Sequence, residues 1–295
     1  MAGPFESAAW LVGVPFSAMF TAVLSGLFDK VELELGLQHY AEMPWFPLFN
    51  VMPLNTVINL GYIGLGLFWC GFTSTALEQG MFKGRDCLLF YIFNIMASCY
   101  GCVQLLRILS HHVVWAVLDQ WCTLPFFAFV FVWGLYLTYG WSSSRAFLIL
   151  MTSIMSYCIT LFCSLGFEII LGIHMACAIT GGVLAYKRYP AAETLSTLYQ
   201  ALLSCSGFVF LKLFDHRLVQ VSSVFKVVSG HFLSKICDIY QIHLVNNFFL
   251  DLTLEKAAAN SLEEKANVLK REEPQTQRPL TDDIIYEFPR RRRDT

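Results

Sequence analysis

Residues Val114 to Thr138 read VWAVLDQWCTLPFFAFVFVWGLYLT. This run of 25 residues holds one charged side chain, Asp119. About 20 consecutive apolar residues suffice to cross the ~30 Å hydrocarbon core of a membrane as a helix. Because lipid offers no partner for backbone N–H and C=O groups, such a segment has to satisfy them internally, which an α-helix does. The stretch therefore predicts a membrane-spanning helix.

Similar runs occur on both sides of this stretch and set the fold class. Hydrophobic residues make up 56% of the 295 residues and charged ones only 14%, against about 25% in soluble domains. We predict an all-α, polytopic membrane helical bundle of eight spans, with a seven-helix core and one extra N-terminal span. The predicted spans are Ala8–Phe28, Met52–Phe72, Cys87–Leu109, Val114–Thr138, Ala146–Leu165, Phe167–Tyr186, Leu195–Leu213 and Gly230–Leu250, with Gly166 alone as the hairpin between the fifth and sixth.

Basic residues are distributed unevenly over the connections, which predicts the orientation. With eight spans, one side receives Lys83, Arg85, Arg145, Lys187, Arg188 and the basic tail, and the other receives Lys30, Arg217 and Lys226. Short cytosolic connections carry the excess of Lys and Arg. We therefore expect both termini in the cytosol and no cleaved signal peptide. The compartment stays open between the endoplasmic reticulum, the Golgi and the plasma membrane.

The chain after the last span changes in composition. We predict a transmembrane bundle over residues 1–250, an amphipathic cytosolic helix over 251–273 and a disordered basic tail over 274–295. Pro274 ends the helical pattern, because proline lacks a backbone N–H. The run Arg290 to Arg293 either binds anionic lipid, acts as a sorting signal or is a solvated charge cluster.

The ten cysteines all fall inside predicted spans. Cysteine behaves there as a small apolar side chain, so packing is favoured over a redox or metal role. Cys99 and Cys102 form a C-x-x-C spacing without a second pair. No disulfide framework is predicted.

Polar residues inside the spans gather at one predicted depth, the non-cytosolic half. His231, Lys235 and Asp238 share one helical face, at spacings of four and three. Ionisable groups in membrane spans usually face the bundle interior and pair with each other. We expect a common cavity that serves either as structural ion pairing or as a binding or reactive site. This predicted polar cluster consists of Gln104, Arg107, Asp119, Glu168, Lys212, Asp215, His231, Lys235 and Asp238.

The remaining histidines are assigned elsewhere. His174 is interpreted as a satisfied core histidine, and His111 and His112 as interfacial residues at a span end. His243 lies roughly 120° from His231 around an ideal helix and is excluded from the cluster.

Four short elements resemble the seven-helix lipid hydrolase superfamily, which includes alkaline ceramidases and adiponectin-type receptors. They are Leu54-Asn55-Thr56-Val57-Ile58-Asn59-Leu60, Leu118-Asp119-Gln120, Gly166-Phe167-Glu168 and Gly230-His231-Phe232-Leu233-Ser234-Lys235. They follow the superfamily's order and leave the first span as an addition.

A closer resemblance, from near residue 28 to about residue 243, is to the vertebrate transmembrane protein 187 family. It implies a multi-pass membrane protein and no particular activity. The strings that carry it are Phe28-Asp29, His39-Tyr40-Ala41-Glu42, Val117-Leu118-Asp119-Gln120-Trp121, Thr123-Leu124-Pro125, Gly166-Phe167-Glu168, Lys212-Leu213-Phe214-Asp215-His216, Gly230-His231-Phe232, Ser234-Lys235 and Cys237-Asp238.

The superfamily resemblance implies a zinc site with three histidines, and this sequence departs from it. Ile108 stands where the first histidine is expected, Gln104 where the helper serine is expected, and Lys235 in place of the last histidine. A lysine ammonium has no free lone pair for a metal. We expect no metal, no cofactor and no catalytic residue, with the Lys235 ammonium in the former metal position neutralising Asp119 and Asp238.

Three functions remain open after these substitutions. The favoured one is a non-catalytic relative of the hydrolases, whose polar intramembrane cavity binds lipid or is structural. The first alternative is a receptor or transporter that uses its buried charges. The second is a metal-dependent lipid amide or ester hydrolase with atypical ligands, using His231 as base or recruiting His111. We expect membrane lipids as partners and no binding of nucleic acid. The sequence does not define protein partners.

Overall fold

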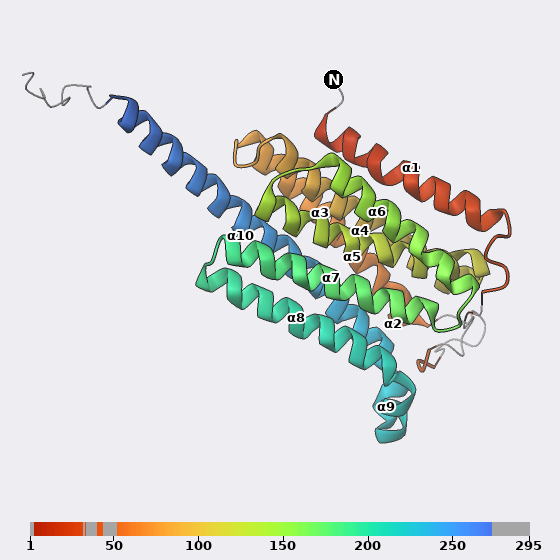
Figure 1. Cartoon of the computed structure of the whole chain (residues 1–295). Coiled ribbons are helices and arrows are strands. Elements are labelled where there is room, and N and C mark those ends of the chain that lie inside the picture. Colours follow the sequence, from red (N-terminus) through yellow and green to blue (C-terminus); the bar gives the residue numbers. More distant parts are fainter. Residues whose placement is uncertain (1–2, 32, 34–39, 44–51, 273–295) are drawn as a thin grey trace, which may run out of the picture. The chain divides into compact units, whose positions relative to one another are not determined.

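The computed structural model describes residues 3–31, 33, 40–43 and 52–272, and side chains up to residue 268 (Figure 1). In these residues the regular structure is helical, and no strand occurs. The elements are α1 (Pro4–Leu24), α2 (Pro53–Val57), α3 (Asn59–Glu78), α4 (Gly84–Ser110), α5 (Val113–Tyr139), α6 (Ser143–Ser156), the 3₁₀ turn η2 (Tyr157–Leu161), α7 (Gly166–Arg188), α8 (Ala192–Leu213), α9 (Asp215–Val221), the 3₁₀ turn η3 (Ser223–Lys226) and α10 (Gly230–Glu272).

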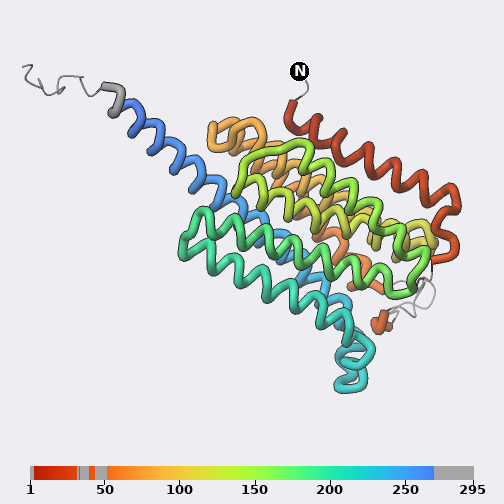
Figure 2. Tube along the Cα trace, in the orientation of Figure 1, coloured from red at the N-terminus to blue at the C-terminus, as the bar shows by residue number. Residues whose placement is uncertain are grey.

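Seven segments are long and apolar enough to span a membrane, and they coincide with the first seven predicted spans. The predicted helical membrane bundle is thus confirmed in class. The eighth predicted span is the first half of α10, which Figure 2 traces among the other helices. This half of α10 is less hydrophobic than the other seven segments, because Lys235, Asp238, Asn246 and Asn247 interrupt its apolar residues.

Two local boundaries differ from the sequence prediction. Gly166 is the first residue of α7 rather than a one-residue hairpin, and residues 162–165 make the connection. The second span is divided at Ile58 into α2 and α3. A single glycine cannot reverse a helix, because the chain needs several residues to turn and to satisfy the backbone groups at both helix ends.

Small residues let the helices approach closely, as is usual where helices pack without a hydrophobic driving force. A Cβ atom at Gly134 of α5 would collide with the backbone of Gly181 of α7. Aromatic rings fill the space beside this crossing. The indole of Trp133 stacks on Phe249 with a centroid distance of 4.2 Å and meets Phe90 edge-on at 4.6 Å.

The part of α10 up to Lys256 is fixed to the bundle by polar contacts. In the buried middle, Asn94 of α4 and Asn246 exchange two amide hydrogen bonds of 2.8 and 3.1 Å. Further along, the Lys256 ammonium donates to the Tyr136 hydroxyl at 2.7 Å and lies 3.6 Å from Asp86. The chain up to Lys256 forms one compact unit and the chain after it a second.

The crossing of α5 and α7 is expected to tolerate no added methyl group. Gly134→Ala should lower the free energy of unfolding by about 1–3 kcal/mol, because overpacking forces backbone shifts. Thermal unfolding in detergent measures the effect. Gly172→Ala is the matched control, since nothing lies within 4 Å of its Cβ position on α7. Equal melting temperatures for both variants would contradict the close crossing.

Candidate functional site

The predicted polar residues lie at one end of the bundle because successive helices alternate in direction. α3, α5, α7 and α10 begin at this end, and α4, α6 and α8 finish there (Figure 1). Residues near these helix ends are thereby collected from distant parts of the sequence. The end is called the polar end below.

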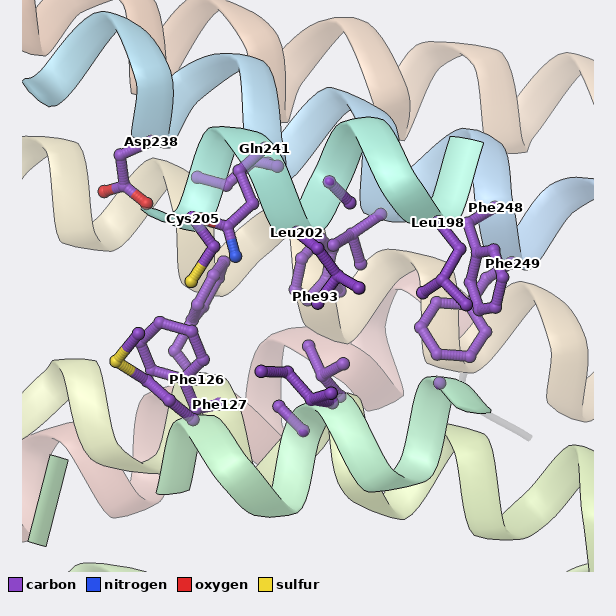
Figure 3. Close-up of a pocket in the computed structure, with 18 residues that line it drawn as sticks. Phe93, Phe126, Phe127, Leu198, Leu202, Cys205, Asp238, Gln241, Phe248 and Phe249 are labelled. Atoms are coloured by element: carbon purple, nitrogen blue, oxygen red, sulfur yellow. The ribbon is translucent and has the colours of Figure 1, made fainter. Parts of the chain in front are cut away.

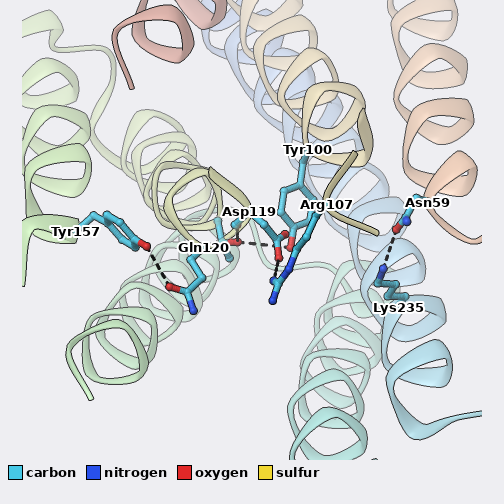
Figure 4. A network of polar contacts seen from close by, with 8 residues as sticks. Asn59, Tyr100, Arg107, Asp119, Gln120, Tyr157 and Lys235 are labelled. Carbon is cyan, nitrogen blue, oxygen red and sulfur yellow. Dashed lines mark hydrogen bonds and ion pairs between the residues drawn. The ribbon is translucent and has the colours of Figure 1, made fainter. Parts of the chain in front are cut away.

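Two parallel helices carry matching polar residues at the polar end. The Lys235 ammonium of α10 donates to Oδ1 of Asn59 on α3 at 2.9 Å. One turn further, the Tyr62 hydroxyl donates to Oδ2 of Asp238 at 2.7 Å. All four side chains are buried. These two rungs, one of which is drawn in Figure 4, are called the α3–α10 polar ladder.

The contact of Lys235 differs from the one expected. Its partner is the neutral amide of Asn59, and in the described part of the chain no carboxylate lies within ion-pair distance of its ammonium. Asp119 and Asp238 still lie within its electrostatic range. The ammonium also lies 6.0 Å from the centre of the Tyr40 ring. Lys235 is therefore stabilised by an amide dipole, an aromatic face and more distant carboxylates.

Asp119 has a different cation as its direct partner. It forms an ion pair with Arg107 of α4, which links the last turns of that helix to the start of α5 (Figure 4). Gln104, one turn earlier on α4, is also buried, and the Thr123 hydroxyl of α5 donates to the Tyr100 hydroxyl. Oδ1 of Asp119 is buried and has no hydrogen-bond partner among the described residues.

Ile108 lies in the last turn of α4, in the interior of the protein. It is buried in a small apolar cluster with Tyr40 and Met52. No group of three or more His, Cys, Asp or Glu side chains within the described ranges is arranged to hold a metal ion.

Asp215 and Glu42 are buried carboxylates that bind backbone N–H groups at helix starts. Asp215 accepts from the N–H of His231 in the first turn of α10 and from the N–H of Ala41, both at 3.0 Å. Glu42 accepts from the N–H groups of Leu54 and Asn55, both at 3.0 Å, at the start of α2. A negative charge at a helix N-terminus is stabilised by the unpaired N–H groups and the helix dipole.

The Asn55 side chain connects these two starts. Its amide nitrogen donates to Glu42 at 2.6 Å and to the Ser229 hydroxyl at 3.2 Å. Ser229 itself accepts from the N–H of Phe232 and so caps α10. The Tyr40 ring meets the His231 imidazole edge-on at 4.5 Å. Burial raises the pKa of Tyr40 to about 12, so its hydroxyl stays neutral at physiological pH.

Two residues of the predicted polar cluster, Glu168 and Lys212, lie apart from the α3–α10 polar ladder. Glu168 is exposed and lines a cavity of about 190 Å³ with Gln120 and Lys30. Lys212 is half-buried, with its ammonium 5.7 Å from the centre of the Phe208 ring, and lies within electrostatic range of Asp119. Neither contacts the α3–α10 polar ladder directly.

Asp238 also faces a second, mainly apolar space. Figure 3 shows Asp238 and Gln241 toward one end of this cavity and phenylalanine rings at both ends. The residues of the predicted polar cluster therefore line more than one cavity. His174 and His243 lie outside the polar ladder, each with both ring nitrogens in hydrogen bonds.

Sequence reasoning missed the roles of Tyr40, Glu42, Asn59 and Tyr62. Tyr40 and Glu42 lie in a connection, where helical spacing gives no signal. For α3 a signal existed. Asn55, Asn59 and Tyr62 are spaced by four and three residues, as are His231, Lys235 and Asp238 on α10, and matched spacings predict two faces that can pair.

The apolar helices and the buried polar end define a multi-pass helical membrane protein. The family model of the TMEM187 protein family matches residues 8–250, and the chain belongs to this family. The chain is similar to Transmembrane protein 187 of Homo sapiens, with 39% identity over 234 residues that cover 79% of this chain and 86% of the relative. It is similar to Transmembrane protein 187 of Bos taurus, with 38% identity over 232 residues, 78% and 90% of the two chains. No solved structure matches.

The Asp215 carboxylate is expected to fix three segments at once. Asp215→Ala should lower the free energy of unfolding by about 1–3 kcal/mol, because the buried N–H groups of Ala41 and His231 lose their acceptor. Asp29→Ala removes an exposed carboxylate and is the control. Thermal unfolding in detergent is the measurement. A melting temperature for Asp215→Ala equal to that of the control would show that the contact carries no stability.

Proposed function

We propose that this chain is a non-catalytic membrane protein in which fixed charges and amides occupy the place of a hydrolytic metal site. The observation that carries the proposal is the hydrogen bond from the buried Lys235 ammonium to Asn59. A cation held in this way supplies positive charge near Asp119 and Asp238 without offering a Lewis acid. The bundle thereby keeps its buried carboxylates while lacking the group that would activate water.

The distant relation to seven-helix lipid hydrolases is part of this proposal. The late His231 and the carboxylate of Asp119 are retained at the positions that the superfamily pattern requires. Ile108 packs in an apolar cluster and Lys235 in a hydrogen bond, so both replacements are integrated into the surrounding structure. These contacts support a site in which the replaced residues stabilise the fold and do not bind a catalytic metal.

A receptor or transporter that binds a ligand or a proton with its buried charges is the second candidate. The observation that favours it is the set of buried oxygens without partners among the described residues, which are Oδ1 of Asp119, Oδ1 of Asn55 and Oε1 of Gln241. Buried acceptors usually have a partner, and a ligand or water can provide it. A transporter requires access to these oxygens from both sides of the membrane in turn. Alternating labelling of the Asp119→Cys variant from both sides would support it.

Loss of the Lys235 ammonium should destabilise the bundle. Lys235→Met is expected to lower the free energy of unfolding by about 1–3 kcal/mol, because Asn59 loses its donor and the nearby carboxylates lose a counter-charge. Thermal unfolding in detergent and abundance in cells are the measurements. Lys226→Met, at an exposed position, is the control. Unchanged folding and abundance in Lys235→Met would contradict the structural role of the ammonium.

Metal analysis separates the proposed function from the hydrolase alternative. The purified protein is expected to contain no stoichiometric zinc, and His231→Ala is expected to leave its metal content unchanged. The measurement is mass spectrometry of the elements in protein kept free of chelators. One zinc per chain that disappears in His231→Ala would establish a metal site and overturn the proposal.

A further inference from the structure

A separate cavity lies between α1, α4, α5 and α6. Its volume is about 410 Å³, within the range of about 300–1,000 Å³ that is typical of small-molecule sites. The lining is apolar apart from a few groups and includes Met19 of α1, Met96 of α4 and Pro125 of α5. None of the residues in the α3–α10 polar ladder lines it. This space is called the lateral cavity below.

The lateral cavity is long and reaches the lipid-facing surface. Along α4 its lining extends from Arg85 to Tyr100, which is about 22 Å at 1.5 Å per residue. That length exceeds one leaflet of a ~30 Å hydrocarbon core. Two of its lining residues, Leu11 and Phe147, are 56% and 67% exposed. An extended hydrocarbon chain could therefore enter from the side.

Arg85 provides a positive charge at one end of this apolar space. It is the one charged residue among those that line the cavity. Its guanidinium lies 4.4 Å from the centre of the Trp141 ring. The neighbouring carboxylate, Asp86, accepts from Tyr136 at 2.7 Å and pairs with Lys256. In the described part of the chain, Arg85 thus has an aromatic partner and no carboxylate partner.

We propose that the lateral cavity binds one acyl chain of a membrane phospholipid whose anionic phosphate headgroup lies against Arg85. The planar guanidinium matches the oxygens of a phosphate and can bind two of them together. The first turn of α6, where Ser142 caps the helix, lies at the same end and adds unpaired N–H groups. Tryptophan at the position of Trp141 is typical of a membrane interface.

The chemistry selects an anionic phospholipid over the other possible occupants. A second copy of the chain would not explain why a cation without a carboxylate partner in the described residues lies at the end of an apolar cavity about 22 Å long. The expected orientation also places Arg85 on the cytosolic side, where the leaflet is rich in anionic lipid. The inference is independent of the proposed function, because it uses neither Lys235 nor His231.

Native mass spectrometry of the full chain in detergent tests the binding. Dioleoyl phosphatidic acid is expected to saturate at one molecule per chain. It should bind at least about tenfold more tightly than dioleoyl phosphatidylcholine, because its phosphate is terminal and carries a net negative charge, whereas the choline cation offsets the charge of the other headgroup. Equal affinities for the two lipids would overturn the headgroup assignment. Tighter binding of oleate than of phosphatidic acid would assign a free fatty acid instead and overturn the phospholipid.

Matched variants locate the site. Arg85→Gln should weaken phosphatidic acid about tenfold, while Lys83→Gln should not, although it removes the same charge two residues away at an exposed position outside the cavity lining. Equal weakening by both would mean general surface attraction and would overturn the site.

The acyl chain is tested by filling the cavity. Ala146→Trp should abolish saturable binding of phosphatidic acid, and Leu148→Trp, at a 67% exposed position outside the lining, should not. Unchanged binding in Ala146→Trp would overturn the acyl-chain placement. If Ala146→Trp does not fold, as judged by its thermal unfolding, Leu150→Trp fills the same space from the next turn of α6. The same two outcomes then apply to it.

Discussion

A buried charge that lacks a partner costs several kcal/mol, and α10 buries two ionisable side chains, Lys235 and Asp238, within one helical turn. Most of the polar end follows from this constraint. Asn59 and Tyr62 occupy the face of α3 that meets Lys235 and Asp238, so α3 and α10 have to lie side by side and in parallel. The partner of Lys235 is a neutral amide and the partner of Asp238 is a hydroxyl. The carboxylates of Asp119 and Asp238 lie within electrostatic range of the Lys235 ammonium without contacting it. The arrangement moderates the desolvation of each charge without forming a close ion pair.

The same end of the bundle solves a second problem, the unpaired N–H groups at helix starts. Glu42 serves α2, while Asp215 and Ser229 serve α10. Since Asp215 also holds Ala41, the connection before α2 is tied to the connection before α10. The hydrogen bonds that cap these helices are therefore also tertiary contacts between distant segments of the chain. Asp215, which the sequence offers as a candidate ligand, therefore acts in this chain as a helix cap.

Seven of the spans could be predicted because each needs little more than a sufficient length of apolar residues. The site was harder. That polar residues from distant segments gather at one end of the bundle follows from helices that alternate in direction, and Arg107 and Asp119 pair there. Which side chains pair with each other could not be predicted. The pairing depends on the rotation of each helix about its axis and on a connection whose side chains follow no periodic pattern. Glu42 is the clearest case, as its acceptor role requires knowing where Asn55 lies. Glu168 shows the converse, since a charge at the same end of the bundle can still be exposed.

The paired amides of Asn94 and Asn246 have a consequence for movement. Each amide nitrogen donates both to the opposite oxygen and to a carbonyl four residues earlier in its own helix, at 2.9 Å. Four polar groups are thus satisfied at one height of an otherwise apolar contact. Sliding α10 by one turn along α4 would leave all of the cross-helix partners facing hydrocarbon. The pair therefore selects a single axial register, and any change of shape in this bundle has to proceed by tilting or bending rather than by a piston motion of α10.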